Sequence, residues 1–149
     1  MDDRIDEPEE TVVVWIDSLV SAELDSNASR GVVAIEDDDD APSVDFASSD
    51  TSVAEASGIV RSILRLSNPS SVALRVAIRP SSGSASLRGF EAGSDAVLWD
   101  SVWIVEIPAG DTTGVFEYGI VGDGRVESTE DFRLAVVDGE GYVASERPA

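Results

Sequence analysis

Hydrophobic and polar residues alternate clearly over residues 72–79, where aliphatic side chains take every second position. A period of two places one set of side chains on a buried face of a strand and the other set toward water. We therefore predict a strand here that ends before Pro80, because proline removes a ladder hydrogen bond. The side chains predicted to face inward are Val72, Leu74, Val76 and Ile78.

Further short apolar runs follow at a spacing of about ten residues, with turn residues between them. We predict strands over 44–46, 52–54 and 58–66, and later strands whose inward positions also alternate. Such a series is typical of a sandwich or a barrel and not of βαβ units. The later inward positions are Trp103, Val105, Ile107, Phe116, Tyr118, Ile120, Phe132, Leu134 and Val136.

The first 36 residues contain two more candidate strands. Residues 11–16 are a β-branched and aromatic run, which favours a strand, and a helix over 12–24 is the alternative. Residues 32–35 read as a second strand after a polar turn. The three tryptophans, Trp15, Trp99 and Trp103, are predicted to be core or strand-packing residues and not a ligand platform.

An acidic stretch separates these two parts of the chain. Ile35 runs directly into five consecutive carboxylates, residues 36–40, which are followed by Ala41 and Pro42. Five adjacent acids repel one another, so they are either solvated in a linker or neutralised by concentrated positive charge. Pro42 prevents a helix from continuing through the stretch. A new structural unit is predicted to begin at residue 43.

The composition narrows the classes of partner. The chain has 149 residues and a formal charge of −20, which favours cations and basic proteins and disfavours nucleic acid. No apolar run approaches the roughly 18 residues of a membrane span. Asp2 and Asp3 follow Met1 where a signal peptide would carry basic residues. We expect no membrane insertion of this segment.

The absence of cysteine, histidine and lysine narrows the chemistry. It excludes thiolate and histidine metal sites, Ser-His and Cys-His nucleophiles, and a Schiff-base lysine. An enzyme would have to work with carboxylates alone, as glycosidases do, and nothing in the sequence marks a cleft for a sugar. We expect no enzymatic activity. Adaptation to high salt is an alternative explanation of the acidity.

The sequence contains an internal repeat. Residues 2–12 align without gaps with residues 122–132, and each segment is an acidic loop followed by a predicted strand. The identical acids are Asp3 with Asp123, Glu7 with Glu127, and Glu10 with Glu130. A period of about 120 residues indicates a tandem of whole domains and not a solenoid of small repeats.

Several fragments, taken in order, resemble the Calx-beta domain, the calcium-binding module of sodium-calcium exchangers, integrin β4 and bacterial adhesins. The resemblance implies an all-β, immunoglobulin-like Greek-key β-sandwich over 43–149 that lacks its last strand. It also implies that 1–36 are the C-terminal strands of a preceding repeat and that 37–42 are a linker. The fragments are 35–46, 53–58, 83–85, 92–95, 105–111 and 126–132.

The same resemblance implies sites for Ca2+, which takes six to eight oxygen ligands. One set would converge at a pole of the sandwich. The acids of the linker belong by position to the preceding repeat, whose own late loop is also acidic. An EF-hand is excluded, because a loop starting at Asp37 would place Pro42 at the glycine position. The first set is Glu55, Asp95, Asp123, Glu127 and Glu130, and the second is Asp37, Asp38, Asp39, Asp40, Asp3, Glu7 and Glu10.

These observations predict a non-enzymatic, calcium-binding repeat of a larger surface or secreted protein. It would act in adhesion, or as a spacer that calcium stiffens at the domain junction. The expected partners are calcium, neighbouring repeats of the same polypeptide and other surface proteins, with head-to-tail strand exchange between copies as a route to self-association. The alternative is an acidic structural spacer adapted to high salt, with no specific metal site.

Overall fold

The computed structural model describes residues 3–23, 25, 29–87, 96–97, 102–122 and 124–145. The described residues contain β-strands, one short 3-10 turn and no α-helix, and no helix long and apolar enough to cross a membrane. The elements are β1 (Glu10–Trp15), β2 (Arg30–Ile35), β3 (Ser43–Phe46), η1 (Glu55–Ser57), β4 (Ile59–Leu66), β5 (Leu74–Ser82), β6 (Ala96–Val97), β7 (Trp103–Ile107), β8 (Thr113–Ile120), β9 (Phe132–Val137) and β10 (Val143–Ala144).

Strands β3 to β10 form a sandwich of two sheets. One sheet has the order β10-β3-β4-β8-β6 and the other has the order β7-β5-β9. Neighbouring strands are antiparallel except for β10, which runs parallel to β3. From β4 onward each successive strand lies in the other sheet from the strand before it. The predicted all-β sandwich is confirmed.

Alternating residues from both sheets fill the core between them. An aromatic row runs through it: the ring centroids of Trp103 and Phe116 lie 4.7 Å apart, those of Phe116 and Tyr118 5.5 Å, and those of Tyr118 and Phe132 5.6 Å. These spacings suit tilted and edge-to-face contacts. The inward set predicted from the alternation is therefore largely correct. The buried core residues are Val44, Val60, Leu64, Leu66, Leu74, Val76, Ile78, Val105, Ile107, Phe116, Tyr118 and Tyr142.

Tyr142 joins the two sheets where β9 ends. The β5–β9 ladder stops at the pair Ala77 with Val137, and the buried Tyr142 hydroxyl accepts the Ala77 N–H at 2.8 Å. The next residue then donates its N–H to the carbonyl of Pro42 at 3.1 Å. The tyrosine thus satisfies a backbone donor at a ladder end and directs the chain toward the first strand of the other sheet.

Three sequence-based expectations about the strands are wrong. Residues 52–54 form no strand, and the chain turns there into η1. Val72 is half exposed, because β5 begins only at Leu74. Pro80 does not end β5, which continues to Ser82 and pairs Pro80 with a residue of β9. The partner strand β7 pairs only as far as Ile78, so proline is tolerated on the side of β5 that has no ladder.

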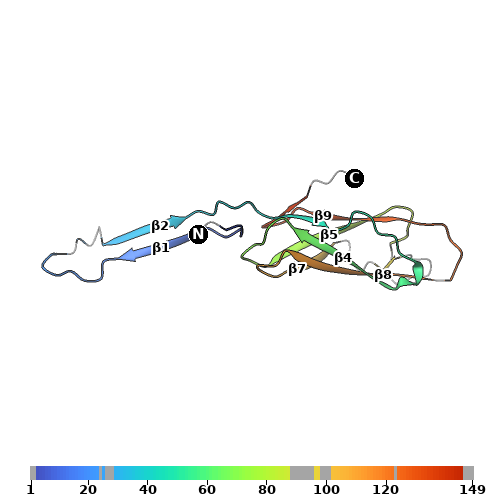
Figure 1. The fold of residues 1–149 in the computed structure, drawn as a ribbon, viewed down its shortest axis with the longest axis horizontal. Helices are drawn as coiled ribbons and strands as arrows, with labels where there is room; N and C mark the ends of the chain where they lie inside the picture. The colour runs from blue at the N-terminus through green and yellow to red at the C-terminus, as the bar shows by residue number, and fades with distance from the viewer. Residues whose placement is uncertain are drawn as a thin grey trace.

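Strands β1 and β2 form a separate antiparallel hairpin, in the register Glu10 with Ile35 to Trp15 with Arg30. Both predicted strands are confirmed, and the alternative helix over 12–24 is wrong. Figure 1 shows the hairpin extending away from the sandwich beyond the acidic stretch. Its apolar side chains stay exposed on both faces, among them Val12, Val13, Val14, Val32, Val33 and Ile35.

The three tryptophans differ in how their predicted positions compare with the structure. Trp103 is partly buried against the core, as predicted. Trp15 is 65% exposed and lies outside the core, with the Arg30 guanidinium 5.3 Å from its ring centroid. Trp15 is therefore not a core residue, because no described residue forms a second layer over the hairpin, but it does pack on the opposite strand through Arg30. Trp99 lies outside the described residues. The boundaries predicted for the repeats, 1–36 and 43–149, stay a prediction.

Candidate metal site

The register of the hairpin brings two acidic segments together. Because Glu10 pairs with Ile35, the residues before β1 lie beside the residues after β2. Between the two segments is a small hollow of about 120 Å³. It is lined by Asp3, Glu7, Pro8 and Glu10 from the first segment and by Ile35, Glu36, Asp37, Asp38 and Asp39 from the second. We call this hollow the acidic pocket.

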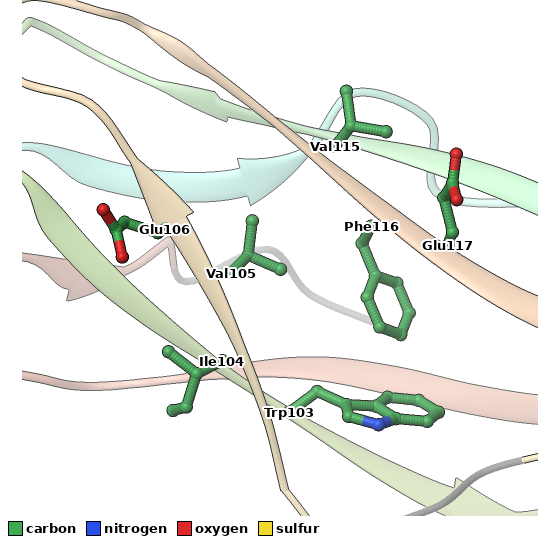
Figure 2. A pocket seen from close by; sticks show the side chains of 7 residues that line it. All are labelled: Trp103, Ile104, Val105, Glu106, Val115, Phe116 and Glu117. Atoms are coloured by element: carbon green, nitrogen blue, oxygen red, sulfur yellow. The ribbon is translucent and has the colours of Figure 1, made fainter.

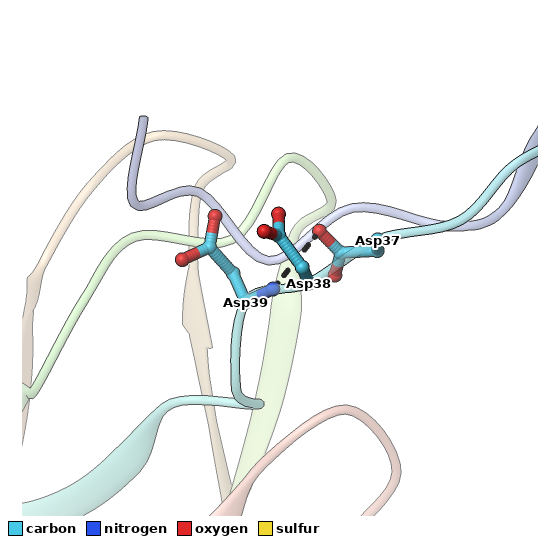
Figure 3. A group of neighbouring side chains, drawn as sticks. All are labelled: Asp37, Asp38 and Asp39. Carbon is cyan, nitrogen blue, oxygen red and sulfur yellow. Dashed lines mark hydrogen bonds between the residues drawn. The ribbon is translucent and has the colours of Figure 1, made fainter. Parts of the chain in front are cut away.

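Asp37, Asp38 and Asp39 form the densest part of the acidic pocket. Each offers a carboxylate oxygen within 4.8 Å of the other two, and this is the one such group in the part of the chain that the structure describes. Figure 3 shows the three side chains along one turn of the linker. Asp38 is exposed and Asp39 is half-buried. Carboxylates at this spacing repel one another unless a cation or solvent screens them.

Hydrogen bonds hold this arrangement in place. One oxygen of Asp37, Oδ2, accepts the N–H of Glu7 at 3.0 Å, which ties the two acidic segments to each other. The other oxygen, Oδ1, accepts the N–H of Asp39 at 3.4 Å. The Asp3 carboxylate accepts the N–H of Ile5 at 3.0 Å. A carboxylate accepts about four hydrogen bonds in all, so each of these oxygens retains capacity for a further contact.

The donor set fits a hard divalent cation. Ca2+ lies 2.3–2.6 Å from its oxygen ligands, so two oxygens on one ion are separated by at most about 5 Å, and the three carboxylate oxygens lie within that limit of one another. All the charged groups that line the pocket are carboxylates, and none of the described lining residues is an arginine. Neither nitrogen nor sulfur ligands are offered. The chemistry suits calcium better than zinc or copper.

The other predicted ligands lie elsewhere. Asp40 is outside the triad, and its carbonyl oxygen accepts the Asn68 side-chain N–H at 3.0 Å. Glu55 is in η1, at the end of the sandwich remote from the hairpin (Figure 1). The backbone of Glu55 lies close to Gly122, since a Cβ added at Gly122 would be 3.2 Å from the Glu55 carbonyl oxygen.

The exposed Glu127 and Glu130 belong to the loop between β8 and β9, at the same remote end as Glu55 (Figure 1). Asp95 and Asp123 lie outside the described residues. Calcium binding by the set that comprises Glu55, Asp95, Asp123, Glu127 and Glu130 stays a prediction.

A contact between Ser84 and Asp131 is the polar feature that sequence reasoning missed. The Asp131 carboxylate accepts the Ser84 N–H at 3.1 Å and its hydroxyl at 2.8 Å, and the Asp131 N–H donates to the Ser84 hydroxyl at 3.0 Å. A Cβ at Gly83 would lie 2.5 Å from the same carboxylate, so only glycine fits there. Two fragments that carry the family resemblance therefore make one contact, which fastens the end of β5 to the start of β9.

The Ser84 contact should make stability depend on pH. Hydrogen bonds from the Ser84 side chain and backbone lower the pKa of Asp131 below its ordinary value of 3.8. The ionised form is therefore favoured in the folded state. The resulting stabilisation is complete above the unfolded pKa and is lost as pH falls through the lower, folded pKa.

Ser84→Ala tests this pH dependence. The melting-temperature difference between the wild type and Ser84→Ala should be largest near neutral pH and should shrink as pH falls below 3.8. The difference that remains at low pH comes from the hydrogen bond between the Asp131 N–H and the Ser84 hydroxyl, which does not depend on the protonation of the carboxylate. A difference that stays constant down to the acid transition would refute the role of the ionised Asp131.

A second hollow opens at the side of the sandwich, between β7 and β8. It has a volume of about 470 Å³ and is lined by Trp103, Ile104, Val105, Glu106, Val115, Phe116 and Glu117. Figure 2 shows its two carboxylates at opposite ends, with apolar side chains between them. Glu117 is paired with Arg61. Its acids do not converge as those of the acidic pocket do.

Neither a scan against protein-family models nor a search of curated proteins finds a match for this chain. The resemblance to the Calx-beta domain therefore stays a prediction that rests on the residue fragments.

Proposed function

We propose that this chain is a calcium-binding, non-enzymatic β-sandwich module of a larger surface or secreted protein. One observation carries the proposal: three aspartates offer oxygens within 4.8 Å of one another, in a pocket whose charged lining is entirely carboxylate. The formal charge of −20 supports it, because the field of the whole protein concentrates cations at the surface. The fragments that resemble Calx-beta domains point in the same direction.

The place of the acidic pocket suggests what calcium would do. The pocket lies between the hairpin and the sandwich, where the segment before β1 runs beside the segment after β2. Without a cation, mutual repulsion of the carboxylates opposes the hydrogen bond that joins the two acidic segments. A bound calcium would replace that repulsion with shared coordination. Calcium would thereby stiffen the junction, which suits a spacer or an adhesive module in the millimolar calcium outside cells, where such modules bind with Kd of about 10⁻⁴–10⁻³ M.

Thermal unfolding in the presence of different salts tests this proposal. Calcium should raise the melting temperature, and above Kd the stabilisation should grow with the logarithm of the calcium concentration, reaching about 2.7 kcal/mol at one hundred times Kd. Magnesium should do much less, because it demands a smaller octahedral site and gives up its water reluctantly. Chelator should reverse the effect.

Sodium chloride at matched ionic strength is the control for screening. If it raises the melting temperature as much as calcium does, the effect is general screening of a negative surface. That result would replace the calcium proposal with the rival one, an acidic spacer adapted to high salt.

A further inference from the structure

The segment before β1 is bound to the sandwich by its backbone. Asp6 forms a parallel β-bridge with Ser70, in the loop between β4 and β5. The Asp6 N–H donates to the carbonyl of Pro69 at 3.1 Å, and the Asp6 carbonyl accepts the Ser71 N–H at 2.9 Å. These distances are those of an ordinary strand ladder. The sandwich loop therefore receives the N-terminal segment as a short additional strand.

A side-chain contact adds to the bridge. The Ser70 hydroxyl donates to the Asp6 carboxylate at 3.2 Å, and Ser70 is only 1% exposed. The Ser70 carbonyl in turn accepts the N–H of Gly110, from the turn between β7 and β8. Asp6 is thus held by a residue that is itself fixed inside the sandwich. Docking at this point positions the segment against a rigid surface.

Both sides of the acidic pocket are tied to the same sandwich loop. Glu7, which lines the pocket and donates to Asp37, is the residue directly after Asp6. On the other side, Asp40 follows the aspartate triad, and its carbonyl accepts the Asn68 side chain. The loop at 67–71 therefore contacts the chain within one residue of each side of the pocket. Separation of the two acidic segments would strain both sets of contacts.

We propose that Asp6 is a positioning residue that couples cation binding in the acidic pocket to the orientation of the hairpin on the sandwich. This inference rests on the proposed calcium site. A cation that draws Glu7 toward the aspartates also holds Asp6 against Ser70. By thermodynamic linkage, the docking of Asp6 must favour the cation by the same factor as the cation favours docking. Asp6 itself lines no part of the pocket.

Distances between paired spin labels test the coupling. The chain has no cysteine, so Val14→Cys on β1 and Ile59→Cys on β4 introduce two exposed labelling sites. Calcium should narrow the distance distribution of the otherwise wild-type chain. Asp6→Ala, which removes the side-chain contact, should broaden the distribution and weaken calcium binding, and Asp6→Pro, which also removes the N–H, should do so further. A coupling of ordinary size predicts a loss of about 5-fold or more in calcium affinity.

Two variants control for the side chain and its charge. Asp6→Asn keeps an acceptor for the Ser70 hydroxyl and should stay near the wild type. Asp50→Ala removes a similar aspartate, which accepts the Ser49 hydroxyl at 3.2 Å in the loop after β3, and should change neither measurement.

The coupling is overturned if Asp6→Pro leaves the calcium affinity unchanged, whether or not the distance distribution broadens. If the wild type does not bind calcium, the proposed function fails instead. The distributions without ion still show, in that case, whether Asp6 orients the hairpin.

Discussion

Replacing Asp38 and Asp39 together by asparagine should abolish the calcium-dependent rise in melting temperature. The two substitutions keep the shape of the side chains but remove two of the three charges of the triad. They leave Asp37 in place, so the hydrogen bond that joins the two acidic segments survives. Asparagine oxygens are weaker calcium ligands than carboxylates because they carry no net charge. Without calcium, the variant should be as stable as the wild type or more stable, since repulsion within the triad is relieved.

Glu127→Gln with Glu130→Gln is the matched control for this experiment. It removes the same amount of charge from the end of the sandwich remote from the acidic pocket (Figure 1). The part of the calcium-dependent shift that comes from the acidic pocket should persist in this variant, which separates that site from the predicted one at the late loop. If the control abolishes the shift and the Asp38 and Asp39 variant retains it, the ligands are those of the late loop, and the acidic pocket is a solvated linker.

Ile78→Ala should cause a large loss of stability. Ile78 is fully buried in β5, between partners on β7 and β9. Truncation of a buried isoleucine costs about 2–5 kcal/mol, through lost transfer energy and the cavity left behind. For a sandwich of this size each kcal/mol lowers the melting temperature by about 4–8 °C. Urea denaturation measures the effect as a lower midpoint with an unchanged m-value.

Ile104→Ala is the control for Ile78→Ala. Ile104 is on the neighbouring strand β7, paired with Ala77, but its side chain is 50% exposed. The same truncation should therefore cost less than half as much. Equal losses at the two positions would contradict the assignment of the inner and outer faces of this sheet.

The parts of the fold that could be predicted are those in which a local pattern decides the structure. Alternation identified the inward residues from Leu74 to Ile78 and those of the later strands, because a buried sheet face requires it. Strand β1 was recognisable from its β-branched run, because such side chains favour an extended backbone. The predictions failed where tertiary context decides. Val72 continues the alternation but precedes the ladder, and Trp15 has no layer to cover it.

The candidate site could be predicted in part. The sequence assigned the acids before β1 and after β2 to the same preceding repeat, and the hairpin register places Asp3, Glu7 and Glu10 around one pocket with the linker aspartates. The Ser84 contact with Asp131 joins residues 47 positions apart. One sequence gives no sign of such a pairing.

The docking of Asp6 on Ser70 was also beyond prediction, since it depends on how two separately folded parts of the chain meet. Short polar loops carry no pattern that identifies their partners. The structure also shows which contacts the acidic stretch at 36–40 makes, which its sequence does not. Part of it lines the acidic pocket, and Asp40 is bound to the sandwich through Asn68.

Isothermal titration calorimetry of the whole chain with calcium, in a background of excess sodium chloride, tests the central claim most directly. The excess salt suppresses diffuse attraction to the negative surface and leaves site binding measurable. We expect saturable heats with a Kd in the millimolar range or below, little heat from magnesium, and loss of the calcium heats in the Asp38→Asn and Asp39→Asn variant. Heats that vanish in sodium chloride, or that are equal for calcium and magnesium, would contradict a calcium site at the junction.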